Sequence, residues 1–206
     1  MNYFVTAIDT DSGKTLVSAI LCEALQADYW KPVQAGLPRD ADTVKSLVSN
    51  SITKIHPEKY LLQSPMSPHA AAKRDGVTIK LSELIAPQTN NKLIIEGAGG
   101  CMVPLNDSEF ILDLIVNLQA KVILVSDIYL GSINHTLLTV QALANRKVHI
   151  EGIIFNGVSN PDTESIILHH ANIKCLMHLN REEHVNKATV KRYAEQLKTH
   201  LLEQLT

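Results

Sequence analysis

Short runs of apolar residues alternate along the chain with longer stretches in which apolar residues recur at helical spacing. The apolar runs predict strands at 2–6, 28–31, 92–96, 121–126, 152–156 and 173–178. The helical spacing predicts helices at 14–26, 40–50, 109–119, 132–145, 162–171 and 182–205. Most of the strands are apolar on both faces, which is typical of parallel strands covered by helices on both sides. The pattern therefore predicts an α/β fold with a mostly parallel sheet between two layers of helices.

The composition narrows the class of protein. A chain of 206 residues can bury the core of one domain, so we expect a single domain over 1–206. The formal charge of −2 provides no basic field, which argues against a nucleic-acid partner and favours a small-molecule role. The cysteines are widely spaced, and the chain shows neither a signal segment nor a long apolar run. We therefore expect reduced thiols, no membrane span and a cytoplasmic protein.

Polar or glycine-rich residues follow the predicted strands. The first strand leads into a loop that ends at Gly13, the second ends at Lys31, the third at Glu96 and the fifth at Asn156. In an open parallel sheet, ligands bind at the carboxyl ends of the strands. The sequence therefore predicts that these residues meet at one edge of the sheet.

The tripeptide Gly13-Lys14-Thr15 indicates a phosphate-binding loop and a P-loop NTPase-like fold. At a helix N-terminus the backbone N–H groups and the helix dipole face a phosphate, Lys14 can reach the β- and γ-phosphates of a nucleotide, and Thr15 can bind magnesium. A strict P-loop pattern has a glycine five residues before Gly13, where this chain has Ile8. The tripeptide alone leaves an ordinary strand-to-helix turn as an alternative. The residues at the other strand ends are therefore needed to decide between the two interpretations.

Charged residues near these strand ends are candidates for metal binding and catalysis. Glu96 is followed by three glycines within four positions, an arrangement that lets a ligand approach the backbone while the carboxylate binds magnesium. Asp40 and Asp42 lie at the start of a predicted helix, where we expect one to be the N-cap and the other the second magnesium carboxylate. Lys31, if it faces the pocket, would add a positive charge near a transferred phosphoryl group.

Taken together, several blocks of the chain resemble the dethiobiotin synthetases, ATP-dependent enzymes of biotin synthesis, in their order and spacing. The blocks are Thr10–Thr15, Lys31–Gly36, Ser67–Ala71, Glu96–Gly100 and Leu130–Thr139. They extend over most of the chain. The Lys-Pro-Val sequence at 31–33 and the last block are specific to that family, whereas the phosphate loop alone matches many ATPases.

The resemblance implies a cyclo-ligase that uses ATP to convert 7,8-diaminopelargonate and carbon dioxide to dethiobiotin, ADP and phosphate. One amine would add carbon dioxide to give a carbamate, phosphoryl transfer would give a carbamic–phosphoric anhydride, and the second amine would close the cyclic urea. Carbamate and γ-phosphate are both anions. Cations are therefore needed between them, and Lys14, Lys31 and magnesium would supply these.

The resemblance also implies roles for individual residues. The catalytic residues would be Lys31, Lys14 and Thr10. ATP would be bound by Asp11, Ser12, Gly13, Lys14, Thr15, Glu96, Gly97, Ala98, Gly99 and Asn156, the last at the adenine ring. The diamine would contact Thr10, Lys31, Ala35, Gly131, Ser132, Ile133 and Asn134, the last four from the partner subunit of a homodimer. Magnesium would be bound by Thr15, Asp42 and Glu96, with Asp42 preferred to Asp40 because the residues after it match the family pattern better.

The chain departs from the family pattern at three places. Ala7 replaces a glycine before the loop. Ala35 replaces a serine or threonine that contacts the substrate, so either Gln34 or a water takes over that contact or the substrate binds more weakly. The segment 174–180 differs from the family segment that lines the base and ribose, which leaves base selectivity open.

Two other protein classes share parts of this pattern. Partition and septum-positioning ATPases are interaction switches with the same predicted fold, but they usually carry a signature lysine where this chain has Asp9. Glutamine-dependent cobyrinate-type amide synthases activate a carboxylate with ATP on a related domain. Those enzymes need a further amidotransferase domain, and a chain of 206 residues has no room for it.

Overall fold

The computed structural model describes residues 2–203, with side chains as far as Thr199. Its main feature is a seven-stranded sheet in the order β4–β2–β6–β1–β7–β8–β9, in which each neighbouring pair is parallel. The strands of this sheet are β1 (Asn2–Ala7), β2 (Asp28–Trp30), β4 (Ile55–His56), β6 (Leu93–Gly100), β7 (Lys121–Asp127), β8 (Ile150–Asn156) and β9 (Cys175–Leu179). A separate parallel pair joins β3 (Val33–Ala35) to β5 (Tyr60–Leu62).

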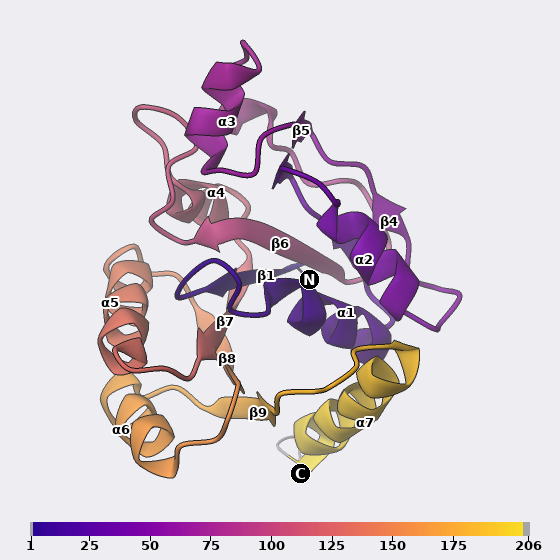
Figure 1. Cartoon of the computed structure of the whole chain (residues 1–206), viewed down its shortest axis with the longest axis vertical. Coiled ribbons are helices and arrows are strands. Elements are labelled where there is room, and N and C mark those ends of the chain that lie inside the picture. The colour runs from indigo at the N-terminus through magenta and orange to yellow at the C-terminus, as the bar shows by residue number, and fades with distance from the viewer. Residues whose placement is uncertain (1, 204–206) are drawn as a thin grey trace.

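Helices cover both faces of the main sheet (Figure 1). One face carries α1 (Lys14–Leu25), α2 (Asp40–Leu47) and α7 (Lys187–Glu203), and the other carries α4 (Ile111–Asn117), α5 (Ser132–Asn145) and α6 (Pro161–Ala171). The short helix α3 (Pro68–Arg74) lies beside β5, and a 3-10 turn spans Leu81–Glu83. The predicted α/β fold with a parallel sheet between two helical layers is confirmed. Within residues 2–203, the helices lack the combination of length and apolar character needed to cross a membrane.

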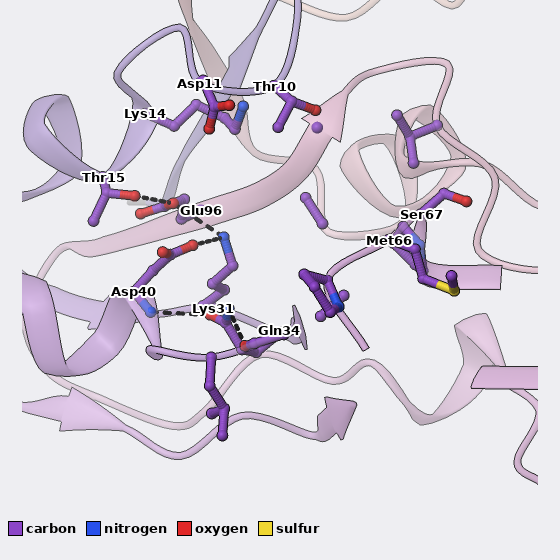
Figure 2. A pocket seen from close by; sticks show the side chains of 18 of the residues that line it. Thr10, Asp11, Lys14, Thr15, Lys31, Gln34, Asp40, Met66, Ser67 and Glu96 are labelled. Atoms are coloured by element: carbon purple, nitrogen blue, oxygen red, sulfur yellow. Dashed lines mark hydrogen bonds and ion pairs between the residues drawn. The ribbon is translucent and has the colours of Figure 1, made fainter. Parts of the chain in front are cut away.

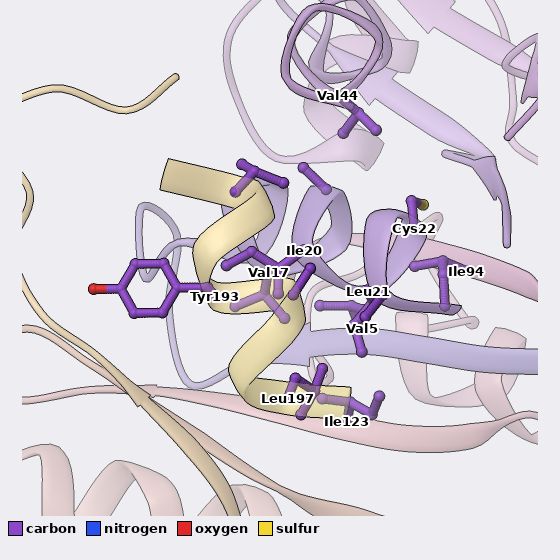
Figure 3. Close-up of a cluster of buried hydrophobic side chains, with 14 of the residues drawn as sticks. Val5, Val17, Ile20, Leu21, Cys22, Val44, Ile94, Ile123, Tyr193 and Leu197 are labelled. Atoms are coloured by element: carbon purple, nitrogen blue, oxygen red, sulfur yellow. The ribbon is translucent and has the colours of Figure 1, made fainter. Parts of the chain in front are cut away.

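Two hydrophobic clusters fill the spaces between the sheet and its helices. On one face Val5 lies in a cluster with Ile20 of α1 and Leu197 of α7 (Figure 3). On the other face Phe4 lies in a cluster with Leu114 of α4. Because alternate residues of β1 enter opposite clusters, the strand is a continuous apolar run in the sequence. Each large apolar side chain buried in this way contributes about 1.5–3 kcal/mol, and together they anchor both ends of the loop between β1 and α1.

The structure adds short elements that the apolar pattern did not predict. These are the strands β3, β4 and β5 and the helix α3, which span only two to seven residues each and carry too little periodicity to be recognised. Helix 132–145 has the predicted bounds. The last helix begins at Lys187 rather than at 182, because the Asn186 side chain accepts hydrogen bonds from two backbone N–H groups of the first turn. Residues 204 and 205 of that prediction lie outside the described residues.

Candidate active site

The loop between β1 and α1 passes through two left-handed backbone positions, Asp11 (φ 57°) and Gly13 (φ 94°). A Cβ at Gly13 would lie 2.5 Å from Asn156 Nδ2, so a side chain there would be strained by its positive φ and would displace the Asn156 side chain. The same Asn156 Nδ2 donates a hydrogen bond to Ser12 O (3.0 Å). The carboxyl end of β8 therefore supports the loop, and the first N–H groups of α1 lie at this edge of the sheet, where an anion can bind.

Lys14, the first residue of α1, folds back onto the loop. Its Nζ donates to Asp9 O (2.9 Å), and Ser12 Oγ donates to the same carbonyl (3.1 Å). Burial, together with the positive charge of Lys31, lowers the pKa of Lys14 to about 8. Because a bound anion favours the charged ammonium, a phosphate at this loop would stabilise protonated Lys14.

Lys31, Asp40 and Glu96 form a charged cluster on the wall of the site (Figure 2). Lys31 follows β2, Asp40 is the first residue of α2, and Glu96 belongs to β6, the neighbour of β2 in the sheet. Lys31 Nζ lies 2.5 Å from Asp40 Oδ2 and 3.0 Å from Glu96 Oε1, and it donates to Gly97 O at 3.2 Å. One ammonium group thus contacts both carboxylates.

The pKa shifts in this cluster follow from burial and from the charges within it. Burial would lower the pKa of Lys31, but the carboxylates of Glu96 and Asp40 raise it overall. Burial would raise the pKa of Glu96, but Lys31 and the hydrogen bonds to the carboxylate lower it overall. The pKa of Asp40 is raised by burial and by the nearby Glu96 carboxylate, against the effect of Lys31. With Lys31 and both carboxylates charged, the cluster carries a net negative charge and attracts a further cation.

Glu96 accepts hydrogen bonds from both sides of its carboxylate. Thr15 Oγ1 donates to Oε1 (2.9 Å), as Lys31 does, and Tyr29 OH donates to Oε2 (2.9 Å). Sequence reasoning missed Tyr29. The only signal for it was its position two residues before Lys31 in the predicted strand 28–31, a spacing that predicts both side chains on the same face.

This geometry favours Asp40 over Asp42, the residue preferred from the sequence. The Asp42 side chain is 57% exposed, pairs with Arg39 (2.6 Å) and lies outside the cavity lining. Asp40 lines the cavity and contacts Lys31. Residues two apart on a helix point in different directions, so only one of these aspartates can face the cavity.

The start of α2 also differs from the prediction. Neither aspartate is the N-cap, because Arg39 occupies that position and Asp40 already belongs to the helix. Gln34 Oε1 accepts the hydrogen bond from Asp40 N (3.0 Å), while Gln34 Nε2 donates to Gly36 O (3.0 Å). Both ends of the Gln34 amide are thus used to shape the wall beside Ala35, and this arrangement disfavours Gln34 as a replacement for the missing hydroxyl at position 35.

A cavity of about 750 Å³ opens between the phosphate loop and the charged cluster. Its wall includes most of the predicted site residues, namely Thr10, Asp11, Gly13, Lys14, Thr15, Lys31, Ala35, Glu96, Ala98 and Gly99. The lining also has an apolar part, formed by Leu37, Pro38, Pro65, Met66 and Val103. Ser12, Gly97 and Asn156 do not belong to this lining. Gly97 O accepts a hydrogen bond from the lining residue Lys31, and Asn156 Nδ2 donates to Ser12 O. The cavity therefore has a polar end suited to phosphate and an apolar side suited to an alkyl chain.

Oxygen atoms dominate the acidic part of the cavity. Thr15, Asp40 and Glu96 supply a hydroxyl and two carboxylates, the hard donors that magnesium uses together with phosphate oxygens. Among the residues that the structure describes, no group of three or more His, Cys, Asp or Glu side chains is placed to hold a metal ion. The donor set thus suits magnesium that arrives with a nucleotide better than a metal held by the protein alone.

The predicted residues Gly131, Ser132, Ile133 and Asn134 do not line this cavity. They form the N-terminus of α5, which Gly131 opens in a left-handed conformation (φ 105°). Ser132 is buried, and its Oγ lacks a hydrogen-bond partner among the described residues. Within one chain, the structure does not bring these four residues together with Lys31.

Comparison with known proteins identifies the family. A family model described as an AAA domain matches residues 1–189. The ATP-dependent dethiobiotin synthetase BioD of Cytophaga hutchinsonii is 56% identical, with 95% of this chain and 96% of that protein covered. The protein of the same name from Christiangramia forsetii is 48% identical (98% of both chains covered), and that from Paramagnetospirillum magneticum is 40% identical (91% of both). The chain belongs to the dethiobiotin synthetase family.

Solved structures with a similar fold come from other families. A putative plasmid partition protein from Borrelia burgdorferi bound to AMPPNP has a TM-score of 0.59 at 12% identity, covering 98% of both chains. The septum site-determining protein MinD from Pyrococcus horikoshii complexed with Mg-ADP has a TM-score of 0.60 at 12% identity, covering 96% of both. At this identity the likeness shows a shared fold alone. It gives no support for a partition-type switch in this dethiobiotin synthetase family member.

Proposed function

We propose that this chain catalyses the ATP-dependent formation of dethiobiotin from 7,8-diaminopelargonate and carbon dioxide, with ADP and phosphate as the other products. The main observation in support of this function is the position of Lys31. In a chain 40–56% identical to named dethiobiotin synthetases, a buried ammonium lies on the wall of a cavity that begins at a phosphate loop. A cation at that place would lie between a bound γ-phosphate and an anionic acceptor.

The proposed reaction proceeds in three steps. A substrate amine attacks carbon dioxide and loses a proton to give a carbamate. A carbamate oxygen then attacks the γ-phosphorus of ATP, and the bond from that phosphorus to the bridging oxygen breaks to release ADP. Finally the second amine attacks the carbonyl carbon of the anhydride, phosphate leaves, and loss of a proton from the attacking nitrogen completes the cyclic urea.

The lysines hold the two reacting anions together. Lys14 would bind the β- and γ-phosphates and Lys31 the carbamate, so that electrostatic repulsion between the reactants is offset. Thr10 also lines the cavity and would contact the reacting amine or carbamate. Asp11, Ser12 and Gly13 would form the phosphate loop around Lys14, and the glycine-rich end of β6 (Gly97–Gly99) would line the nucleotide. Asn156 would read the adenine ring, next to the loop that it supports.

We propose Thr15, Asp40 and Glu96 as the residues that hold magnesium. A bound magnesium ion would neutralise charge on the β- and γ-phosphates. The support is that Thr15 and Asp40 both contact the Glu96–Lys31 ion pair. Thr15 Oγ1 lies 2.9 Å from Glu96 Oε1, and Asp40 Oδ2 lies 2.5 Å from Lys31 Nζ. Asp40 takes the place that the sequence pattern gave to Asp42.

We also propose that the whole chain acts as one domain and pairs as a homodimer. The support for pairing is a group of exposed apolar side chains around the start of α5, which is typical of an interface. The group consists of Tyr129 (36% exposed), Leu130 (103%), Ile133 (37%) and Leu138 (55%). In such a dimer, Gly131–Asn134 would offer the N-terminal N–H groups of α5 to the substrate carboxylate in the partner's cavity.

One assay tests the proposed function. The protein is incubated with ATP, magnesium, 7,8-diaminopelargonate and labelled bicarbonate, and an acid-stable labelled product is sought alongside ADP. We expect label in the cyclic urea and phosphate release that requires the diamine. ATP turnover that is independent of the diamine and yields no labelled urea would contradict the proposal.

A further inference from the structure

The Glu96 carboxylate is supported by Tyr29, a residue that does not line the cavity. Thr15 and Lys31 donate hydrogen bonds to Oε1, whereas among the described residues Tyr29 OH alone donates to Oε2, at 2.9 Å. Glu96 is 1% exposed and Tyr29 is 0% exposed. Solvent therefore cannot replace the tyrosine hydroxyl if it is removed.

Strand pairing and hydrophobic packing hold Tyr29 in place. Tyr29 lies in β2, opposite Ile94 of β6 in the sheet register, and its ring belongs to the hydrophobic cluster that includes Ile94 and Cys22 of α1. Because packing fixes the ring, the Tyr29 hydroxyl is a rigid hydrogen-bond donor to the Glu96 carboxylate.

The two oxygens of Glu96 therefore have different surroundings. Oε1 faces Thr15 and Lys31, which line the cavity, and Oε2 faces Tyr29, which does not. A magnesium ion bound by Thr15 would meet Oε1. Once its oxygen binds a metal, the Thr15 hydroxyl would turn away from its present hydrogen bond to Glu96. The orientation of the carboxylate would then depend more on the hydrogen bond from Tyr29.

We infer that Tyr29 is a positioning residue for magnesium binding: its hydroxyl holds Oε2 and so presents Oε1 of Glu96 to the metal. This inference rests on the proposed magnesium site of the proposed function. A residue that holds a metal-ligating carboxylate typically changes metal affinity 10–100-fold when its hydrogen bond is lost. The effect should appear in metal binding itself, before any chemical step.

The test is the variant Tyr29→Phe, which removes one oxygen and keeps the packed ring. Mn²⁺ binding in the presence of a non-hydrolysable ATP analogue is followed by electron paramagnetic resonance, and turnover is measured over a range of Mg²⁺ concentrations. We expect the metal concentration at half-saturation to rise about 10-fold. The nucleotide Kd without metal should change less than about 2-fold, and kcat at saturating Mg²⁺ should stay near the unmodified value.

Tyr193→Phe is the matched control. Tyr193 is also buried (3% exposed), and its hydroxyl also donates to a carboxylate, that of Glu182, but neither residue lines the cavity. We expect this variant to lower thermal stability without changing the metal dependence. In addition, Glu96→Gln combined with Tyr29→Phe should bind metal no more weakly than Glu96→Gln alone, because Tyr29 acts through Glu96.

Unchanged metal dependence in Tyr29→Phe, whatever its thermal stability, overturns the inference. So does an equal shift in Tyr193→Phe, because the effect would then be a general loss of stability. Failure of the proposed function has a different signature: the unmodified protein would bind Mn²⁺ with nucleotide and form no dethiobiotin, while the Tyr29→Phe shift in metal binding would persist.

Discussion

Lys31 Nζ and Asp40 Oδ2 lie 2.5 Å apart in an ion pair that joins the end of β2 to the first residue of α2. The pair decides which of two nearby aspartates enters the cavity. Asp42 lies on the same helix but points toward Arg39, with which it forms an exposed ion pair. Because α2 begins at Asp40, the Asp40 carboxylate faces the cavity and that of Asp42 does not.

The first prediction compares these two aspartates. Asp40→Asn should raise the Mg²⁺ concentration at half-maximal dethiobiotin formation by about 10-fold or more, because it removes a carboxylate from the proposed metal site. Asp42→Asn makes the same chemical change one half-turn away and should stay within about 2-fold of the unmodified protein, because an exposed ion pair contributes little. Steady-state kinetics over a range of Mg²⁺ concentrations measures both. The reverse order of effects would restore Asp42 as the ligand.

Lys31→Ala should lower turnover far more than it lowers ATP affinity. Its ammonium faces the proposed carbamate, and removal of one group that stabilises developing charge typically costs about 10²–10³-fold in kcat. ATP affinity, measured by calorimetry, should fall less than about 5-fold because the phosphate loop and Lys14 remain. Lys45→Ala, an exposed lysine of α2, is the control. Equal losses in turnover and affinity would show that Lys31 acts mainly on the nucleotide.

Much of the fold could be predicted because burial on both faces leaves a direct trace in the sequence. Strands such as β1 and β7 are continuous apolar runs, and α5 combines helical spacing with a glycine at its start. The pair β3–β5 left no such trace, since each strand has only three residues and is shaped by tertiary contacts. The boundary of α7 was set by a side-chain cap at Asn186, which apolar spacing does not encode.

Site residues could be predicted where a charged or hydroxyl side chain lies at the end of a predicted strand or follows the loop after it. Lys14, Thr15, Lys31 and Glu96 all come from such positions and meet in one cavity. The choice of Asp40 depended on where a helix begins, and Gln34 accepts the hydrogen bond at that point from outside the helix. Tyr29 could not be predicted, because a tyrosine within a buried strand carries the same signal whether its hydroxyl supports a carboxylate or only finds a partner.

Gly13→Ala should abolish detectable nucleotide binding. The added Cβ would lie 2.5 Å from Asn156 Nδ2, and the alanine would have to keep a positive φ. The residue is therefore strained, and the Asn156 side chain that supports the loop must move. Gly76→Ala is the control for conformation alone, because Gly76 also has a positive φ (68°) but no atom of the described residues would lie within 4 Å of the added Cβ. That variant should lose about 1 kcal/mol of stability and bind ATP normally. Calorimetric titration with ATP tests both, and normal binding by Gly13→Ala would show that the loop tolerates the displacement.

Ile133→Glu should convert the proposed dimer to monomers. A charge placed within the exposed apolar group at the start of α5 would be desolvated on pairing, which costs far more than the apolar contact contributes. Sedimentation velocity should show the change, together with a loss of dethiobiotin formation if the partner supplies the carboxylate site. Ile52→Glu, at an exposed isoleucine in the loop after α2, should leave the sedimentation coefficient unchanged. An unmodified protein that sediments as a monomer at every concentration would contradict the proposed pairing.

Asp28 gives the fold a defined acid dependence. Burial alone would raise the pKa of this carboxyl, but hydrogen bonds to its charged form outweigh burial and lower the pKa to about 2. The donors are Asn91 Nδ2 (2.9 Å), Thr89 Oγ1 (2.7 Å), His56 Nε2 (2.9 Å) and the backbone N–H of Lys54 (3.1 Å). A carboxyl whose pKa is lower in the folded chain contributes stability above its unfolded pKa and loses that contribution as the pH falls through the folded value.

For Asp28 the contribution is about 2 kcal/mol at neutral pH, fades below about pH 4 and is largely gone near pH 2. Asp28→Asn should therefore be less stable than the unmodified protein by about 2–3 kcal/mol at pH 7, since an amide nitrogen would also face hydrogen-bond donors. The difference should narrow by about 1 kcal/mol between pH 5 and pH 3, as the unmodified protein alone loses this contribution. Urea unfolding at several pH values measures it, with Asp107→Asn as the control at an exposed aspartate. A difference that stays constant over that range would show that Asp28 stabilises the sheet edge through its shape and hydrogen bonds, independently of its charge.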